Sequence, residues 1–190
     1  MTEEISKRVN RSWTTRDIMV TAIISIALGV LYIPLSYAIG LLYTVPLLYP
    51  FVVGIYYFPI IMVAYLIRKP GVAIFSSMVI HLVTIPFTPW GITMLMSGFF
   101  IGLPIEAVFL AGRYKNFKLW YLVIVGAITG LVNATISYVM MGFANISPSL
   151  QIVYVIGYMI SGAVLGGLLA KFIGDAVFKT GIISNVSDET

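Results

Sequence analysis

Glu106 and His81 are the two residues of this sequence whose side chains are hardest to explain as packing. Glu106 is the only acidic residue within the apolar stretches, because the other acids lie in the tails or at the ends of those stretches. His81 is the only histidine. A carboxylate inside a membrane costs about 2.5–3.5 kcal/mol on insertion scales, so it is expected to face protein groups and to serve a function. We predict that both side chains bind a substrate.

Further polar and aromatic side chains recur at helical spacing. Asn133 shares a helical face with Thr129 and Ser137. Several aromatic and amide residues would lie at a similar, outer level of the membrane, where some are expected to serve only as interface anchors. Together they predict an aromatic pocket in the outer half of the membrane, with a few polar groups that orient a ligand. The predicted lining, besides Glu106, His81 and Asn133, is Trp90, Tyr49, Tyr56, Tyr138, Gln151, Tyr154 and Tyr158.

The sequence excludes several kinds of chemistry. There is no cysteine, and one histidine with one buried acid does not supply the three or four ligands of a metal site. No phosphate-binding G-x-x-x-x-G-K-[ST] motif is present, so the chain does not hydrolyse ATP. We therefore predict a protein that binds and carries, with no catalytic residue, no cofactor and no metal.

The elements that must position these residues are membrane helices. Apolar residues make up 60% of the chain and charged residues 9%, which is outside the range of a soluble domain. Six stretches are long and apolar enough to predict an all-α, single-bundle, polytopic membrane protein. Their predicted bounds are 17–40, 45–67, 71–85, 91–112, 119–143 and 150–173. Residues 1–16 and 176–190 are then cytoplasmic tails around a membrane domain of residues 17–175.

The basic residues predict the orientation of this bundle. All eleven Lys and Arg residues lie in the N-terminal tail, in the second and fourth connections, or near the C-terminal end. The first, third and fifth connections contain none. Positively charged loops stay on the cytoplasmic side during insertion, so both termini are predicted inside. The net charge of +4 then reflects topology and contact with anionic lipid in the bilayer, and it does not indicate nucleic-acid binding.

Small residues recur every four positions in the first stretch, at Thr21, Ser25 and Gly29. Such a ridge lets two helices approach closely, and here it could serve a partner protein. Similar ridges at Gly126 and Gly130, and at Gly162 and Gly166, are expected to pack within the bundle.

Three segments resemble a known family. They are RDIMVTAIISIALGVLY at residues 16–32, the proline-rich second stretch, and GLPIEAVFLAGRYKN at residues 102–116. The chain resembles the S components of energy-coupling factor (ECF) transporters, and within them the YkoE family, linked to thiamin and hydroxymethylpyrimidine (HMP). The family's A-x-x-x-A ridge is not met in register, since Ile26 follows Ala22 at that spacing.

The resemblance implies a multi-pass protein of a prokaryotic plasma membrane that captures a vitamin. It also implies a transmembrane coupling protein and two ATPase subunits as partners. In such a site Glu106 would engage the aminopyrimidine or neutralise the thiazolium cation, the aromatic residues would stack, and His81 and Asn133 would complete the hydrogen bonds. Two other hypotheses remain open at this point. One is a self-contained, proton-coupled carrier that uses Glu106, and the other is a membrane scaffold that docks a partner on the first helix.

Overall fold

The computed structural model describes residues 12–42, 45, 48–140 and 147–181. Its helices, in chain order, are α1 (Thr15–Leu42), α2 (Tyr49–Val52), the 3₁₀ helix η1 (Val53–Tyr56), α3 (Phe58–Ile67), α4 (Val72–Thr84), the 3₁₀ helix η2 (Ile85–Phe87), α5 (Thr93–Ala111), α6 (Leu119–Met140), α7 (Pro148–Ser161), the π-helix η4 (Gly162–Leu168) and α8 (Leu169–Lys179). Five of the resulting segments are long and apolar enough to cross a membrane, and the segment of residues 72–87 is apolar but shorter. The prediction of an all-α membrane bundle is confirmed, with each predicted stretch matched by one segment.

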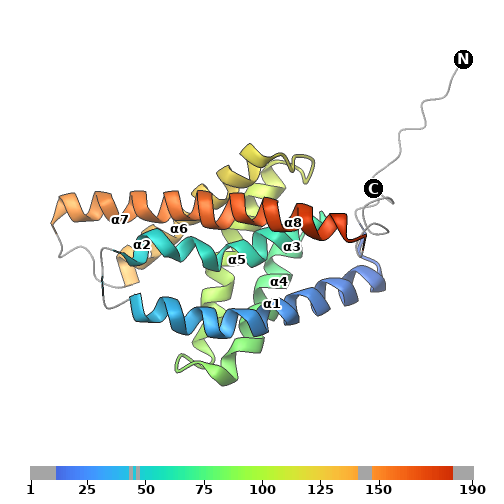
Figure 1. Cartoon of the computed structure of the whole chain (residues 1–190), viewed down its shortest axis with the longest axis horizontal. Coiled ribbons are helices and arrows are strands. Elements are labelled where there is room, and N and C mark those ends of the chain that lie inside the picture. Colours follow the sequence, from blue (N-terminus) through green and yellow to red (C-terminus); the bar gives the residue numbers. More distant parts are fainter. Residues whose placement is uncertain (1–11, 43–44, 46–47, 141–146, 182–190) are drawn as a thin grey trace, which may run out of the picture.

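The proline-rich second segment forms the centre of the bundle. In Figure 1 the teal α2 and α3 run between the blue α1 and the long rod made by α7, η4 and α8, and α4 and α5 cross behind them. Every residue of α3 is buried. Pro50 and Pro59 stand in the first turns of α2 and α3, where the missing N–H has no intrahelical partner to lose. Proline therefore divides this segment into short pieces without leaving a helix interior broken.

Glycine lets α6 approach the π-helix η4 to backbone contact. A Cβ atom on Gly126 would overlap the carbonyl group of Gly162, and a Cβ atom on Gly162 would overlap the carbonyl group of Gly126. The expectation that these two ridges pack within the bundle is confirmed. Close backbone approach through small residues is how membrane helices gain packing energy when lipid is as apolar as their side chains.

The ridge on α1 packs inside the molecule as well, which corrects the expectation that it docks a partner. Thr21 and Ser25 are fully buried, and Gly29 is buried with them. A Cβ atom on Gly29 would lie 2.9 Å from the Cβ atom of Val83 and 3.2 Å from the carbonyl oxygen of Ile80. Because α4 already covers this face of α1, the ridge is not available to another protein in this structure.

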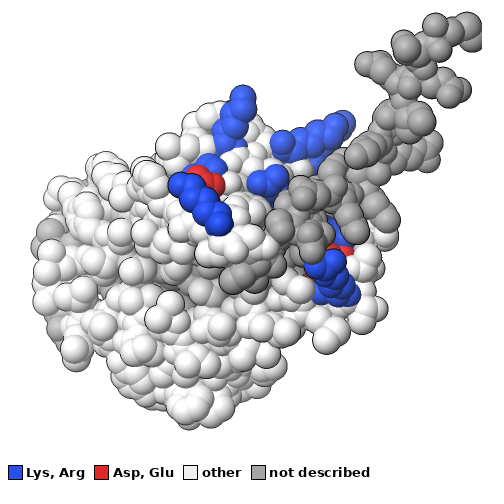
Figure 2. Space-filling model, turned by 45° about the vertical axis from the view of Figure 1, so that its right-hand side comes forward, with Lys and Arg blue, Asp and Glu red and all other residues white. Residues whose placement is uncertain are grey.

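Basic side chains gather on one side of the molecule, which we call the basic end (Figure 2). The Lys69 ammonium group pairs with the carboxylate of Asp17, and the indole N–H of Trp13 donates to the carbonyl oxygen of Pro70 at 2.8 Å. The Arg68 guanidinium lies over the rings of Phe117 (4.9 Å) and Phe178 (5.2 Å). These contacts bring together the start of α1, the α3–α4 turn, the α5–α6 turn and the end of α8.

Candidate functional site: an uncharged aromatic cavity

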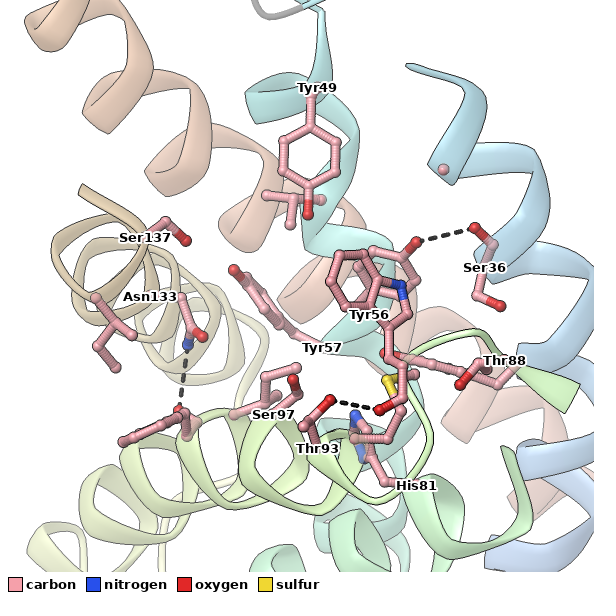
Figure 3. A pocket seen from close by; sticks show the side chains of 18 of the residues that line it. Ser36, Tyr49, Tyr56, Tyr57, His81, Thr88, Thr93, Ser97, Asn133 and Ser137 are labelled. Carbon is pink, nitrogen blue, oxygen red and sulfur yellow. Dashed lines mark hydrogen bonds between the residues drawn. The ribbon is translucent and has the colours of Figure 1, made fainter. Parts of the chain in front are cut away.

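A cavity of about 620 Å³ lies in the half of the bundle away from the basic end. Its lining comes from the C-terminal half of α1, from α2 and η1, from the loop of residues 88–90, and from the adjoining parts of α4, α5, α6 and α7. In Figure 3, Tyr49 and Tyr57 point into this space from the α2–α3 segment, and His81 lies beside Thr93 at another wall. Ligand pockets are typically about 300–1,000 Å³, so the cavity has the size of a small-molecule site.

Six of the ten predicted ligand-binding residues line this cavity: Tyr49, Tyr56, His81, Trp90, Asn133 and Tyr158. Tyr154 stands next to it, since Tyr154 is buried and its hydroxyl is 2.9 Å from that of the lining residue Tyr158. Tyr138 and Gln151 are not in the lining, and the Tyr138 hydroxyl donates to Oε1 of Gln151 at 3.4 Å. The sequence interpretation therefore identified helices that line the cavity, but it did not distinguish the lining residues from neighbouring residues on the same helices.

Glu106 lies outside the cavity lining, against the expectation of a ligand-binding carboxylate. Its Oε1 accepts the backbone N–H of Gly71 at 2.6 Å, and its Oε2 accepts that of Ala73 at 3.0 Å. These two donors belong to the start of α4, where backbone N–H groups have no intrahelical acceptor and the helix dipole favours an acid. Glu106 is 3% exposed. The physical reason for its burial is thus a helix cap supplied by α5.

The Glu106 carboxyl group also influences the neighbouring turn. Burial and, next, the proximity of Glu106 raise the pKa of the Tyr114 hydroxyl well above its usual value. Tyr114 therefore stays a neutral phenol at any physiological pH. Its ring stacks on Phe109 with the centroids 5.4 Å apart, so the same acid that caps α4 borders the aromatic cluster at the basic end.

His81 contributes a polar atom to the cavity in a fixed orientation. Its Nδ1 lies 2.8 Å from the backbone carbonyl oxygen of Ser77, and its ring faces that of Tyr32 with the centroids 5.4 Å apart. On the other side the ring abuts Gly98, where a Cβ atom would come within 2.9 Å of Cγ and Nδ1. The imidazole is fully buried, and Nε2 has no hydrogen-bond partner among the described residues.

Asn133 is also oriented by the backbone. Its Nδ2 donates to the carbonyl oxygen of Thr129 at 3.0 Å and to that of Phe100 at 3.4 Å, which ties α6 to α5. Because carbonyl oxygens only accept, the amide nitrogen is the atom committed to the backbone. The side-chain oxygen is then the group that Asn133 can offer to a ligand.

Eight of the 23 lining residues carry Phe, Tyr or Trp rings. Tyr32 packs on Tyr56 with the centroids 5.1 Å apart, and the Tyr56 hydroxyl donates to the carbonyl oxygen of Ser36 at 3.4 Å. Trp90 lines the cavity with 67% of its surface exposed, so it stands at an open edge. Lining residues that the sequence interpretation missed include Tyr32, Ser36, Tyr37, Tyr57, Thr93 and Ser97. Tyr32 and Ser36 follow Gly29 by three and seven positions, so extending the small-residue face of the first stretch would have found them.

Among the described residues, the lining contains no Asp, Glu, Lys or Arg. The described part of the chain also holds no group of three or more His, Cys, Asp or Glu residues that could bind a metal ion. What the site can do is enclose a small, largely flat molecule between aromatic faces and meet its polar edges with hydroxyl, imidazole and amide groups.

Comparison with known proteins agrees with this arrangement. The family described as "ABC-type cobalt transport system, permease component" matches residues 16–132. YkoE of Bacillus subtilis (strain 168), which carries the name of an HMP/thiamine permease protein, is 31% identical over 180 residues, covering 93% of this chain and 90% of that protein. A crystal structure described as an S component of an ECF transporter superposes with a TM-score of 0.87 at 31% identity, covering 93% of this chain and 91% of that one. The chain belongs to the YkoE family of ECF transporter S components.

Membership of this family agrees with the resemblance seen in the sequence and makes the chain a multi-pass protein of the plasma membrane. S components are the substrate-binding membrane subunits of their transporters. The cavity is therefore the candidate substrate-binding site of this fold.

Proposed function

We propose that this S component captures thiamin or its pyrimidine precursor HMP in the 620 Å³ cavity and releases it inside the cell when a transmembrane coupling protein and two ATPase subunits act on it. The observation that carries the proposal is the cavity itself: it has the size of a vitamin site, aromatic walls and a few oriented polar groups. The name of the YkoE relative supports the choice of ligand.

Thiamin matches the cavity without a carboxylate. Its cationic thiazolium ring is favoured over aromatic faces, and Tyr56, Tyr158 and Trp90 offer such faces. Its aminopyrimidine ring can meet His81 and Asn133. HMP lacks the cation and would use only the second set of contacts. Glu106 has no part in either mode, because both of its oxygens cap α4.

We further propose that the basic end faces the cytoplasm, with both termini inside. Positive-inside bias supports this orientation, because the segments rich in Lys and Arg meet on one side of the fold (Figure 2). The cavity, in the other half of the bundle, would then open toward the outside, where a vitamin is captured.

The test is the small molecule that accompanies the purified protein. Ser97 lines the cavity, whereas its neighbour Met96 does not and is 56% exposed. We expect mass spectrometry of the denatured protein to release thiamin or HMP from the wild type and from Met96→Trp, but not from Ser97→Trp. A wild-type protein that carries neither molecule and binds neither when they are added would refute the ligand assignment.

The two alternatives lose their structural basis. A proton-coupled carrier requires Glu106 at the substrate, but Glu106 lies outside the cavity lining. A scaffold that docks on the α1 ridge requires that ridge to be exposed, but α4 covers it. We expect the purified chain in proteoliposomes to bind its ligand without transporting it. Uptake should require the coupling protein and ATPase subunits, and uptake by the chain alone would favour the carrier.

A further inference from the structure

Three buried polar atoms on the cavity lining have no hydrogen-bond partner in the described part of the protein: Nε2 of His81, the hydroxyl of Tyr57 and Oγ1 of Thr88. His81 is fully buried and Tyr57 is 1% exposed. Buried polar groups are nearly always paired, because an unpaired one loses its hydration without compensation. All three residues line one cavity, which indicates that a ligand supplies the missing partners. The two hydroxyl groups can donate or accept, so among these three atoms only Nε2 of His81 specifies the polarity of the ligand group that meets it.

The polarity of His81 follows from the other nitrogen of its ring. Nδ1 lies 2.8 Å from the carbonyl oxygen of Ser77, and a carbonyl oxygen only accepts, so Nδ1 carries the proton. No carboxylate of the described residues lines the cavity to stabilise an imidazolium, and in the neutral ring Nε2 is then a hydrogen-bond acceptor. Tyr32 and Gly98 hold the ring on its two sides, so this acceptor cannot turn away. The group that meets Nε2 must therefore be a donor.

The charge of the lining restricts the ligand further. A phosphate ester in this cavity would lose its hydration and find no Lys or Arg side chain. The aromatic wall instead favours a flat ring, either neutral or cationic. The basic end, which could attract an anion, lies at the other end of the bundle.

We propose that His81 selects the unphosphorylated ligand by accepting, at Nε2, a hydrogen bond from the ligand's amino group. This inference rests on the proposed function and specifies which ligand atom His81 recognises. The resemblance had implied that Glu106, on α5, engages the aminopyrimidine. In this proposal His81, on α4, accepts the hydrogen bond from the amino group instead.

The experiment measures two affinities for each form of the full-length protein in detergent. The probes are 4-amino-5-hydroxymethyl-2-methylpyrimidine and the same compound with hydrogen in place of the amino group. We expect the wild type to bind the amino compound about 10- to 100-fold more tightly, the ratio that one paired acceptor provides. In His81→Phe, which keeps a flat ring but no acceptor, this ratio should fall to about one. His81→Gln, whose amide oxygen can accept, should restore part of it.

Tyr57→Phe is the matched control, because it removes another unpaired polar atom from the same cavity. It should weaken both compounds by a similar factor and leave their ratio unchanged. An unchanged ratio in His81→Phe, or equal affinities in the wild type, would overturn the role of His81 while leaving the proposed function in place. The phosphate ester should bind at least about 100-fold more weakly than the amino compound, and equal binding would overturn the charge argument. A wild type that binds no pyrimidine and no thiamin would refute the proposed function itself.

Discussion

Replacing Glu106 by alanine separates a structural role from a ligand-binding role. The change removes both acceptors from the start of α4 and leaves the N–H groups of Gly71 and Ala73 without partners. An unpaired buried donor costs about 1–3 kcal/mol; the Ala73 donor is buried and the Gly71 donor is partly buried, so the free energy of unfolding should fall by about 1–5 kcal/mol. Glu106→Gln keeps one carbonyl oxygen and should lose about half as much. Ligand affinity should change less than about threefold in both, because Glu106 does not line the cavity.

Two measurements on the same purified samples decide the matter: thermal unfolding in detergent and ligand titration. Leu110→Ala is a suitable control on the same helix, since Leu110 is 50% exposed and is not among the residues that line the cavity. We expect Glu106→Ala to unfold on the order of 10 °C below the control while it still binds the ligand. Lost binding at an unchanged unfolding temperature would mean that Glu106 is a ligand group after all.

Two further predictions concern packing and the basic end. Gly126→Ala should lower the unfolding temperature strongly, because its Cβ atom would overlap the backbone of Gly162, whereas Gly40→Ala should not, because nothing lies within 4 Å of that position. In a double-mutant cycle, Asp17→Asn and Lys69→Met should show a coupling of about 1–3 kcal/mol in the free energy of unfolding. The reason is that the two side chains form a mostly buried ion pair. Additive effects of the two substitutions would show that the pair does not contribute to stability.

The helical segments could be predicted because hydropathy is a property of consecutive residues. A stretch of about 20 apolar residues can be identified without knowing which helices it packs against, and its length is set by the thickness of the bilayer. The largest error in the bounds is at the C-terminal end, where α8 continues to Lys179 and the prediction stopped at residue 173. Lys171 and Asp175 lie inside this helix and pair at 2.5 Å, so the two charges are satisfied one turn apart.

The site was predicted only in part because its decisive contacts join residues far apart in the sequence. Glu106 meets backbone groups 33 and 35 positions earlier, and a backbone donor leaves no trace in the residue types. An isolated acid in an apolar stretch looks the same whether it binds a ligand or caps a helix. His81 lines the cavity, but the polarity of its Nε2 depends on the contact of Nδ1 with the carbonyl oxygen of Ser77, which only the structure shows.

The short helix α4 explains why these two residues have different roles. Glu106 caps the first turn of α4, and the later turns of α4 carry Ser77 and His81. The Ser77 hydroxyl donates to the carbonyl oxygen of Gly98 at 2.7 Å, which fixes α4 against α5 at the level of the imidazole. A disturbance at the cap must therefore displace the whole helix before it reaches His81. For this reason loss of Glu106 should cost stability first and affinity only later, whereas loss of His81 should change ligand selectivity directly.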